Sequence, residues 1–175
     1  MINLRTPVIA FTGHHNAGKT MLLEKVIDQL TREGIRVGSI KHHGSSDLDF
    51  DIPGKDSDRH ARAGARRVVM VSPMGIAEYH SVAEEPTVQQ ALSHFSDSDV
   101  DVILSEGYKH AGFPSIAVAR SETDSVGTLH VLLTPSVVAV ACDDALASFV
   151  PRDLKVVNID DVDRVCALVK SIAKL

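Results

Sequence analysis

The sequence predicts an α/β fold in which a mostly parallel sheet lies between two layers of helices, giving a three-layer domain. Short, uninterrupted apolar runs alternate along the chain with segments of helical periodicity, which is the pattern of parallel strands connected by helices. The first apolar run is followed by a glycine-rich turn and then by an amphipathic helix. Neither internal repeats nor linker-like segments divide the chain, so we expect a single domain over residues 1–175.

A strand–helix–strand unit is predicted within the first 40 residues. Residues 8–11 form an apolar run without alternation, which is typical of a strand covered on both faces. Residues 36–40 predict a second strand, and Gly34 ends the helix between the two strands as its C-terminal cap. The apolar side chains at helical spacing in this helix are Met21, Leu22, Val26, Ile27 and Leu30.

The rest of the chain continues the alternation of strands and helices. A polar, acidic loop at residues 42–56 precedes a short helix at 57–63, paired strands at 67–72 and 76–80, and a helix at 87–95. Further strands are predicted at residues 101–104, 116–119, 130–133, 137–141 and 155–158. The last helix includes Val162 to Ile172, with Asp160 or Asp161 as its N-cap.

The glycine-rich turn matches the pattern G-x-x-x-x-G-K-[ST] in full. It consists of Gly13, His14, His15, Asn16, Ala17, Gly18, Lys19 and Thr20. The glycines let the backbone turn around a phosphate and point N–H groups at it, and the following helix directs its positive dipole end there. Lys19 supplies a cation for the outer phosphates and Thr20 a hydroxyl for Mg²⁺, whereas His14 and His15 are expected to contribute only backbone donors. The turn therefore predicts a P-loop NTPase-like domain that binds a nucleoside triphosphate.

A second acidic group is expected near the metal, at the end of a neighbouring strand. The apolar residues 102–104 lead to Glu106, and Gly107 lets the chain turn away from the strand. We predict that Glu106 serves Mg²⁺, directly or through other groups; the alternative is an ordinary exposed acid at a strand end. Asp101 begins the same strand and is expected at the opposite edge of the sheet.

A row of alternating acids follows the second strand, at Asp47, Asp49 and Asp51. Carboxylates in such a row are able to hold a metal or to position water at the γ-phosphate, and we count Lys19, Asp49 and Asp51 as the candidate catalytic residues. A solvated edge that prevents wrong strand pairing explains the row equally well. Histidines and cysteines at the spacing of a tetrahedral zinc site are not found beside it.

Composition argues against several classes of partner. The net charge of -5 disfavours a general association with nucleic acid or with an anionic membrane. The longest apolar stretch is broken well before the ~18 to 20 residues that a membrane span needs. Cys142 and Cys166 both lie in apolar surroundings and are expected to be reduced core thiols. The cytoplasm is the expected compartment.

Three blocks together resemble the MobB family of molybdopterin-guanine dinucleotide biosynthesis adapter proteins. The first block is the P-loop, which many families share. The second is Lys41-His42, the alternating acids, and then Pro53-Gly54-Lys55-Asp56-Ser57 with Ala63-Gly64-Ala65 beyond it. The third is Ile103-Leu104-Ser105-Glu106-Gly107-Tyr108-Lys109, with Pro114 and Arg120 downstream. The resemblance covers residues 8 to 120, and its second block is specific to the family.

The resemblance implies a protein that binds GTP with Mg²⁺, hydrolyses it slowly and is usually a homodimer. It also implies a partner, the MobA-type molybdenum cofactor guanylyltransferase, which joins GMP from GTP to molybdopterin. On this basis residues 13–20 hold the GTP phosphates, and Thr20 and Glu106 serve Mg²⁺. The preference for guanine rests on the resemblance alone, because the sequence has no Asn-Lys-x-Asp motif.

Two other functions are compatible with the same P-loop. A small-molecule kinase would use Asp49, Asp51 or Glu106 as its base, and stoichiometric phosphate transfer to an acceptor would identify it. A non-hydrolysing assembly protein would hold a nucleotide or the pyrophosphate of a pterin, and tight binding without phosphate release would identify it. The adapter GTPase is the favoured hypothesis because the second block is family-specific, whereas a P-loop alone is not.

Overall fold

The computed structural model describes residues 4–44 and 51–175, which form two compact units. The larger unit contains the chain up to His42 together with Val88–Leu175, and the smaller unit is His43–Thr87. A single domain over residues 1–175 stays a prediction, since the smaller unit interrupts the chain of the larger one. Within the described residues, every helix is too short or too polar to cross a membrane.

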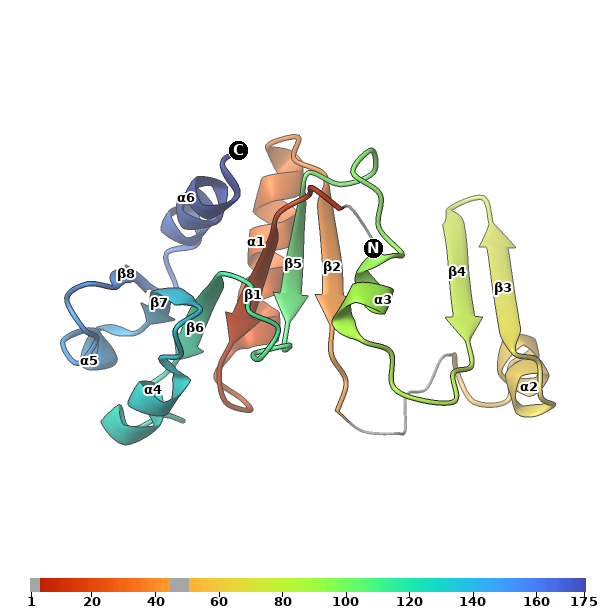
Figure 1. The fold of residues 1–175 in the computed structure, drawn as a ribbon, viewed down its shortest axis with the longest axis horizontal. Helices are drawn as coiled ribbons and strands as arrows, with labels where there is room; N and C mark the ends of the chain where they lie inside the picture. Colours follow the sequence, from red (N-terminus) through yellow and green to blue (C-terminus); the bar gives the residue numbers. More distant parts are fainter. Residues whose placement is uncertain (1–3, 45–50) are drawn as a thin grey trace. The chain divides into compact units, whose positions relative to one another are not determined.

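The larger unit is a six-stranded sheet with helices (Figure 1). Its strands are β1 (Val8–Thr12), β2 (Val37–Lys41), β5 (Val102–Glu106), β6 (Ser115–Ala119), β7 (Val137–Cys142) and β8 (Lys155–Asn158). Its helices are α1 (Lys19–Arg32), α3 (Val88–Leu92), α4 (Val126–Leu132), α5 (Asp144–Ala147) and α6 (Val162–Ala173). The strand order is β2-β5-β1-β6-β7-β8, and all neighbours are parallel.

Both faces of this sheet are covered, which confirms the predicted three-layer α/β arrangement. Helices α1 and α6 pack on one face, where Leu22, Val26 and Leu30 meet Val165 and Val169 in the larger core cluster. On the other face a second cluster joins β6 and β7 to α4 and α5. Burial on both faces explains why β1, β5, β6 and β7 are continuous apolar runs rather than alternating ones.

One predicted strand is wrong: residues 130–133 belong to helix α4 and the turn after it. Short apolar runs do not distinguish a strand from a helix by periodicity. The segment is helical because Ser125 and Thr128 form a reciprocal capping box at its start. Helical periodicity then separates its apolar residues, so that Leu129 is fully buried while Val131 is 75% exposed.

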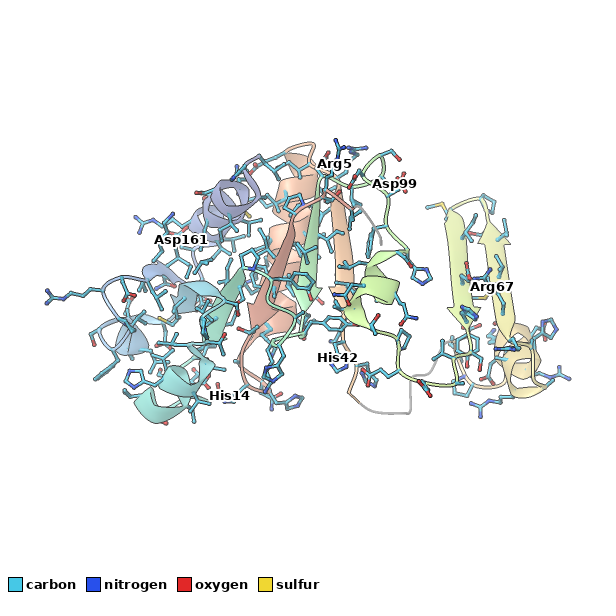
Figure 2. The ribbon with its side chains drawn as sticks, viewed as in Figure 1. Arg5, His14, His42, Arg67, Asp99 and Asp161 are labelled. Atoms are coloured by element: carbon cyan, nitrogen blue, oxygen red, sulfur yellow. The ribbon has the colours of Figure 1, made fainter. Side chains whose placement is uncertain are left out.

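The start of α6 and the start of β5 each have an identifiable polar anchor. Asp161, rather than Asp160, caps α6 and accepts a hydrogen bond from the backbone N–H of Arg164. Asp101 lies at the amino end of β5, as predicted, and forms an ion pair of 2.6 Å with Arg36. Figure 2 shows His14 and His42 at the end to which the strands point, and Arg5 and Asp99 at the other end.

The smaller unit consists of α2 (Asp56–Arg62) and an antiparallel pair, β3 (Arg67–Ser72) and β4 (Gly75–His80). The predicted helix and paired strands are present at these places. One face of the hairpin carries Val69, Val71 and Ile76, which the pairing of Val71 with Ile76 brings together. These side chains are 51%, 75% and 73% exposed.

Candidate functional site

The P-loop connects the carboxyl end of β1 to the first turn of α1, as predicted. Two of its residues adopt left-handed backbone angles, Asn16 with φ 63° and Gly18 with φ 86°. Gly13 needs to be glycine for a different reason, since a Cβ there would lie 2.4 Å from the carbonyl oxygen of Val118 in β6. These residues permit the tight turn that a P-loop needs to direct backbone N–H groups at a phosphate.

Lys19 lies at the first position of α1 with its ammonium folded over the loop. Its Nζ donates to the carbonyl oxygens of Gly13 at 3.0 Å and His14 at 2.6 Å. Burial lowers the pKa of Lys19, and this effect outweighs the opposing influence of the Glu106 and Asp124 carboxylates. A partly desolvated cation at a helix N-terminus is suited to binding the outer phosphates of a nucleotide.

Glu106 is placed beside the P-loop because β5 is the neighbour of β1, with Phe11 opposite Glu106 in the parallel register. The hydroxyl of Thr20 donates to both carboxylate oxygens of Glu106, at 3.0 Å each. A hydroxyl and a carboxylate at this distance are hard oxygen donors of the kind that Mg²⁺ prefers. The predicted pair of Thr20 and Glu106 is thus brought together, and its chemistry fits the expected metal.

The first two residues of the second family-like block, Lys41 and His42, meet the third block at the same end of the sheet. Lys41 ends β2 directly beside Glu106, and its Nζ lies 3.4 Å from a Glu106 carboxylate oxygen. The next residue, His42, places its ring 5.0 Å from that of Tyr108. The backbone N–H of His42 also donates to the Glu106 carbonyl at 2.9 Å. Sequence reasoning assigned no role to Lys41, although its cation lies against the proposed metal ligand.

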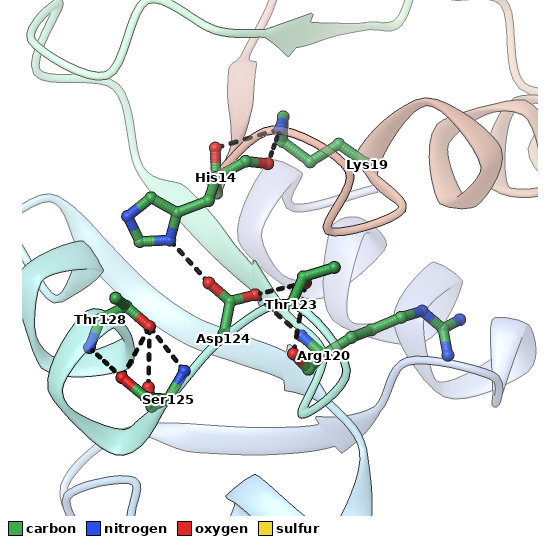
Figure 3. A network of polar contacts seen from close by, with 8 residues as sticks. His14, Lys19, Arg120, Thr123, Asp124, Ser125 and Thr128 are labelled. Atoms are coloured by element: carbon green, nitrogen blue, oxygen red, sulfur yellow. Dashed lines mark hydrogen bonds and ion pairs between the residues drawn. The ribbon is translucent and has the colours of Figure 1, made fainter.

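The opposite side of the P-loop is built by β6 and the loop that follows it (Figure 3). The Nδ1 atom of His14 lies 2.6 Å from a carboxylate oxygen of Asp124, whose side chain is fully buried. The guanidinium of Arg120 lies beside Gly18 and pairs with Asp160 at 2.7 Å. Sequence reasoning missed Asp124 and expected only backbone donors from His14, because the two residues are 110 positions apart.

The remaining predicted residues are distributed as follows. His15 and Asn16 are exposed at the P-loop, and Ala17 is buried beneath it. Asp51 belongs to the smaller unit, where it accepts a hydrogen bond from the Ser57 hydroxyl that lowers its pKa. Asp47 and Asp49 lie outside the described residues. Across residues 4–44 and 51–175, no group of three His, Cys, Asp or Glu side chains is placed to hold a metal.

The sequence matches the family model described as "MobB: Molybdopterin guanine dinucleotide synthesis protein B" over residues 8–143, which is well over half of the chain. The chain belongs to the MobB family. A curated relative, the molybdopterin-guanine dinucleotide biosynthesis adapter protein of Escherichia coli K12, is 35% identical over 161 residues. That match covers 90% of this chain and 87% of the relative.

Solved structures agree with the MobB assignment at the level of the fold. The crystal structure of Bacillus subtilis MobB has a TM-score of 0.76 at 22% identity, covering 95% of this chain and 98% of that one. The hydrogenase maturation factor HypB of Archaeoglobus fulgidus has a TM-score of 0.55 at 16% identity, covering 96% and 90%. At these identities the likeness shows a shared fold and nothing about ligands.

Proposed function

We propose that this chain is a GTP-binding adapter with weak GTPase activity in molybdopterin guanine dinucleotide synthesis. The observation that carries the proposal is the convergence of Lys19, Thr20 and Glu106 at one end of the sheet, in a chain of the MobB family. The E. coli relative is named an adapter protein in the same synthesis. The cytoplasm, where this synthesis would need GTP, is the proposed compartment.

Each group of the site has a part in nucleotide binding. The backbone N–H groups of the P-loop and the dipole of α1 hold the phosphates, and Lys19 neutralises the outermost ones. Thr20 and Glu106 would hold Mg²⁺, which neutralises charge between the β- and γ-phosphates. Since Glu106 already accepts from Thr20 and faces Lys41, it is poorly suited to act as a general base. The poor basicity expected of Glu106 supports slow turnover. Asp49 and Asp51 stay the proposed catalytic carboxylates.

The proposed partner is a MobA-type guanylyltransferase, with molybdopterin as the group that receives GMP. An adapter of this kind would present nucleotide to the partner rather than transform an acceptor of its own. The test is calorimetric titration of the purified chain with GTP and with ATP, each with Mg²⁺, followed by phosphate-release assays with and without the partner. Preferential GTP binding with slow release supports the adapter. Equal binding or a preference for ATP, with phosphate transfer to a small molecule, would establish a kinase instead.

A homodimer is also part of the proposal. The exposed apolar face of the β3–β4 hairpin supports it, because Val69, Val71 and Ile76 lie together there with more than half of each side chain exposed. We expect Val71→Asp to lower the dimer fraction in sedimentation velocity, because a charge opposite Ile76 is costly to bury. The control is Val131→Asp, which changes an equally exposed valine of α4. An unchanged sedimentation coefficient for Val71→Asp would exclude this face as the contact.

A further inference from the structure

Strand β6 and the loop after it hold the P-loop at three points. The carbonyl of Val118 fills the space beside Gly13, so the loop begins in direct contact with the β6 backbone. The ring of His14 reaches Asp124, and Arg120 lies against Gly18, where a Cβ would be 3.2 Å from its Nε. The phosphate-binding loop is therefore supported along its length by one neighbouring segment.

Asp124 is the centre of this support (Figure 3). Its carboxylate accepts hydrogen bonds from the backbone N–H of Arg120 at 3.1 Å and from the Thr123 hydroxyl at 3.0 Å. Both donors are local to the loop, whereas the contact with His14 at 2.6 Å is long-range. Because a carboxylate can only accept, Nδ1 of His14 is the donor, and the buried carboxylate would lose a partner if the ring moved.

His14 transmits this anchor to the cation of the site. Its carbonyl oxygen accepts from Lys19 Nζ at 2.6 Å, while its ring is held by Asp124. A displacement of the His14 peptide would move both the Lys19 ammonium and the backbone N–H groups that face a phosphate. Affinity for an anion in such a loop depends on these donors being fixed before the ligand arrives.

We propose that Asp124 is a positioning residue for triphosphate binding, which acts through Nδ1 of His14 and touches no ligand itself. The inference rests on the proposed function, since it concerns the same phosphate site. It adds a buried carboxylate from the β6–α4 loop to the groups that support phosphate binding. It also gives the ring of His14 a role.

Two amide substitutions of His14 distinguish the positioning role from direct contact between the ring and the ligand. The side-chain amide of His14→Asn places an N–H near the position of Nδ1, whereas that of His14→Gln places it near Nε2. Measured by calorimetry with GTP and Mg²⁺, His14→Asn is expected within about threefold of the wild-type affinity. His14→Gln and Asp124→Asn are expected to bind about 10-fold or more weakly. The reverse order of the two His14 variants would show that the ring contacts the ligand through Nε2, and would overturn the proposal.

Two control variants exclude general effects on the fold. His94→Gln changes an exposed histidine outside the P-loop, in the turn after α3. Asp97→Asn changes a carboxylate that accepts from the backbone N–H of Arg5 and from both the N–H and the hydroxyl of Thr6, at the far end of the sheet. Both controls should bind GTP like the wild type, even though Asp97→Asn is expected to lower the melting temperature. Equal loss of binding in Asp97→Asn and Asp124→Asn would reduce Asp124 to a structural residue.

A spectroscopic signature keeps the inference distinguishable from the proposed function. Nitrogen-15 spectra of the His14 ring should show a protonated Nδ1 in the wild type that exchanges rapidly with solvent in Asp124→Asn. If the wild type binds no triphosphate, the proposed function fails and the positioning role fails with it. If the wild type binds GTP and Asp124→Asn binds equally well, the positioning role alone fails. Should Asp124→Asn not fold, the two His14 variants decide the question.

Discussion

The two sides of the P-loop are built from opposite kinds of chemistry. On the β5 side, Glu106 is 15% exposed and is surrounded by the Thr20 hydroxyl and the Lys41 ammonium, groups that can exchange partners with a ligand. On the β6 side, the side chain of Asp124 is fully buried and is hydrogen-bonded to the His14 ring, the Arg120 backbone and the Thr123 hydroxyl. We therefore expect the β5 side to face ligand and metal and the β6 side to hold the loop in place.

Lys19 stands between the two sides, and its removal should have the largest effect on binding. In Lys19→Ala the outer phosphates lose a charge-assisted hydrogen bond of up to about 3 kcal/mol, which corresponds to about 100-fold in affinity. Calorimetry with GTP and Mg²⁺ measures this loss. The melting temperature should hardly change, because the ammonium contacts loop carbonyls and not the core.

Lys25→Ala is the matched control for Lys19→Ala, because Lys25 is an exposed lysine of the same helix. It should bind GTP like the wild type. Wild-type affinity in Lys19→Ala would mean that residues 13–20 do not form the triphosphate site, whatever the resemblance to P-loop proteins.

Gly13→Ala tests the β6 side by pushing the loop away from it. The added methyl would lie 2.4 Å from the Val118 carbonyl, which belongs to a central strand and cannot yield. We expect GTP affinity to fall about 10-fold or more and the melting temperature to fall as well. Gly127→Ala in α4 is the control, since its methyl would be 3.7 Å from the nearest atom and alanine favours a helix. Normal GTP affinity in Gly13→Ala would show that contact with β6 is dispensable.

Glu106→Gln tests the β5 side. The amide keeps the size of the side chain but removes the charge that Mg²⁺ would meet, so binding without metal should be preserved. The gain in affinity on adding Mg²⁺ should shrink by about 10-fold. Titrations of GTP with Mg²⁺ and with excess chelator measure the two affinities. A variant with the full wild-type gain would assign the metal to another group.

The same contrast explains which parts of the site were predictable. Residues 13–20 and Glu106 could be predicted as site residues from the sequence because the P-loop is a local pattern and Glu106 directly ends an apolar strand. Asp124 was not found because its contact with His14 depends on β6 lying beside β1. Strand order is a tertiary property that no short window of sequence reveals.

The fold was predictable where burial imposes a pattern. The prediction for the buried strand β1 missed only Thr12. Residues 155–158 were predicted with the bounds that β8 has, although this edge strand is exposed or half-buried. Residues 130–133 were assigned to a strand because this short, mostly apolar run shows no helical periodicity by itself. The signal for the helix lies upstream, in the capping box of Ser125 and Thr128. Helix α5 was missed because four residues carry no periodicity.

Asp101→Asn should have the smallest effect on binding, because it changes β5 at the end remote from Glu106. Hydrogen bonds from Arg36 lower the pKa of Asp101 to about 2 in the folded protein. A carboxyl whose pKa is depressed by folding stabilises the fold above its unfolded pKa, and that contribution is lost as the pH falls towards the folded value. Asp101→Asn should therefore melt at a lower temperature than the wild type at about pH 7, with the difference shrinking by about pH 3 and below.

GTP affinity should stay within about twofold of the wild type, since Asp101 contacts nothing at the P-loop end. Thermal melts across this pH range and one calorimetric titration measure both quantities. A large loss of affinity would mean that the two ends of β5 are coupled, and the contrast between ligand-facing and scaffold residues would then have to extend along the whole strand.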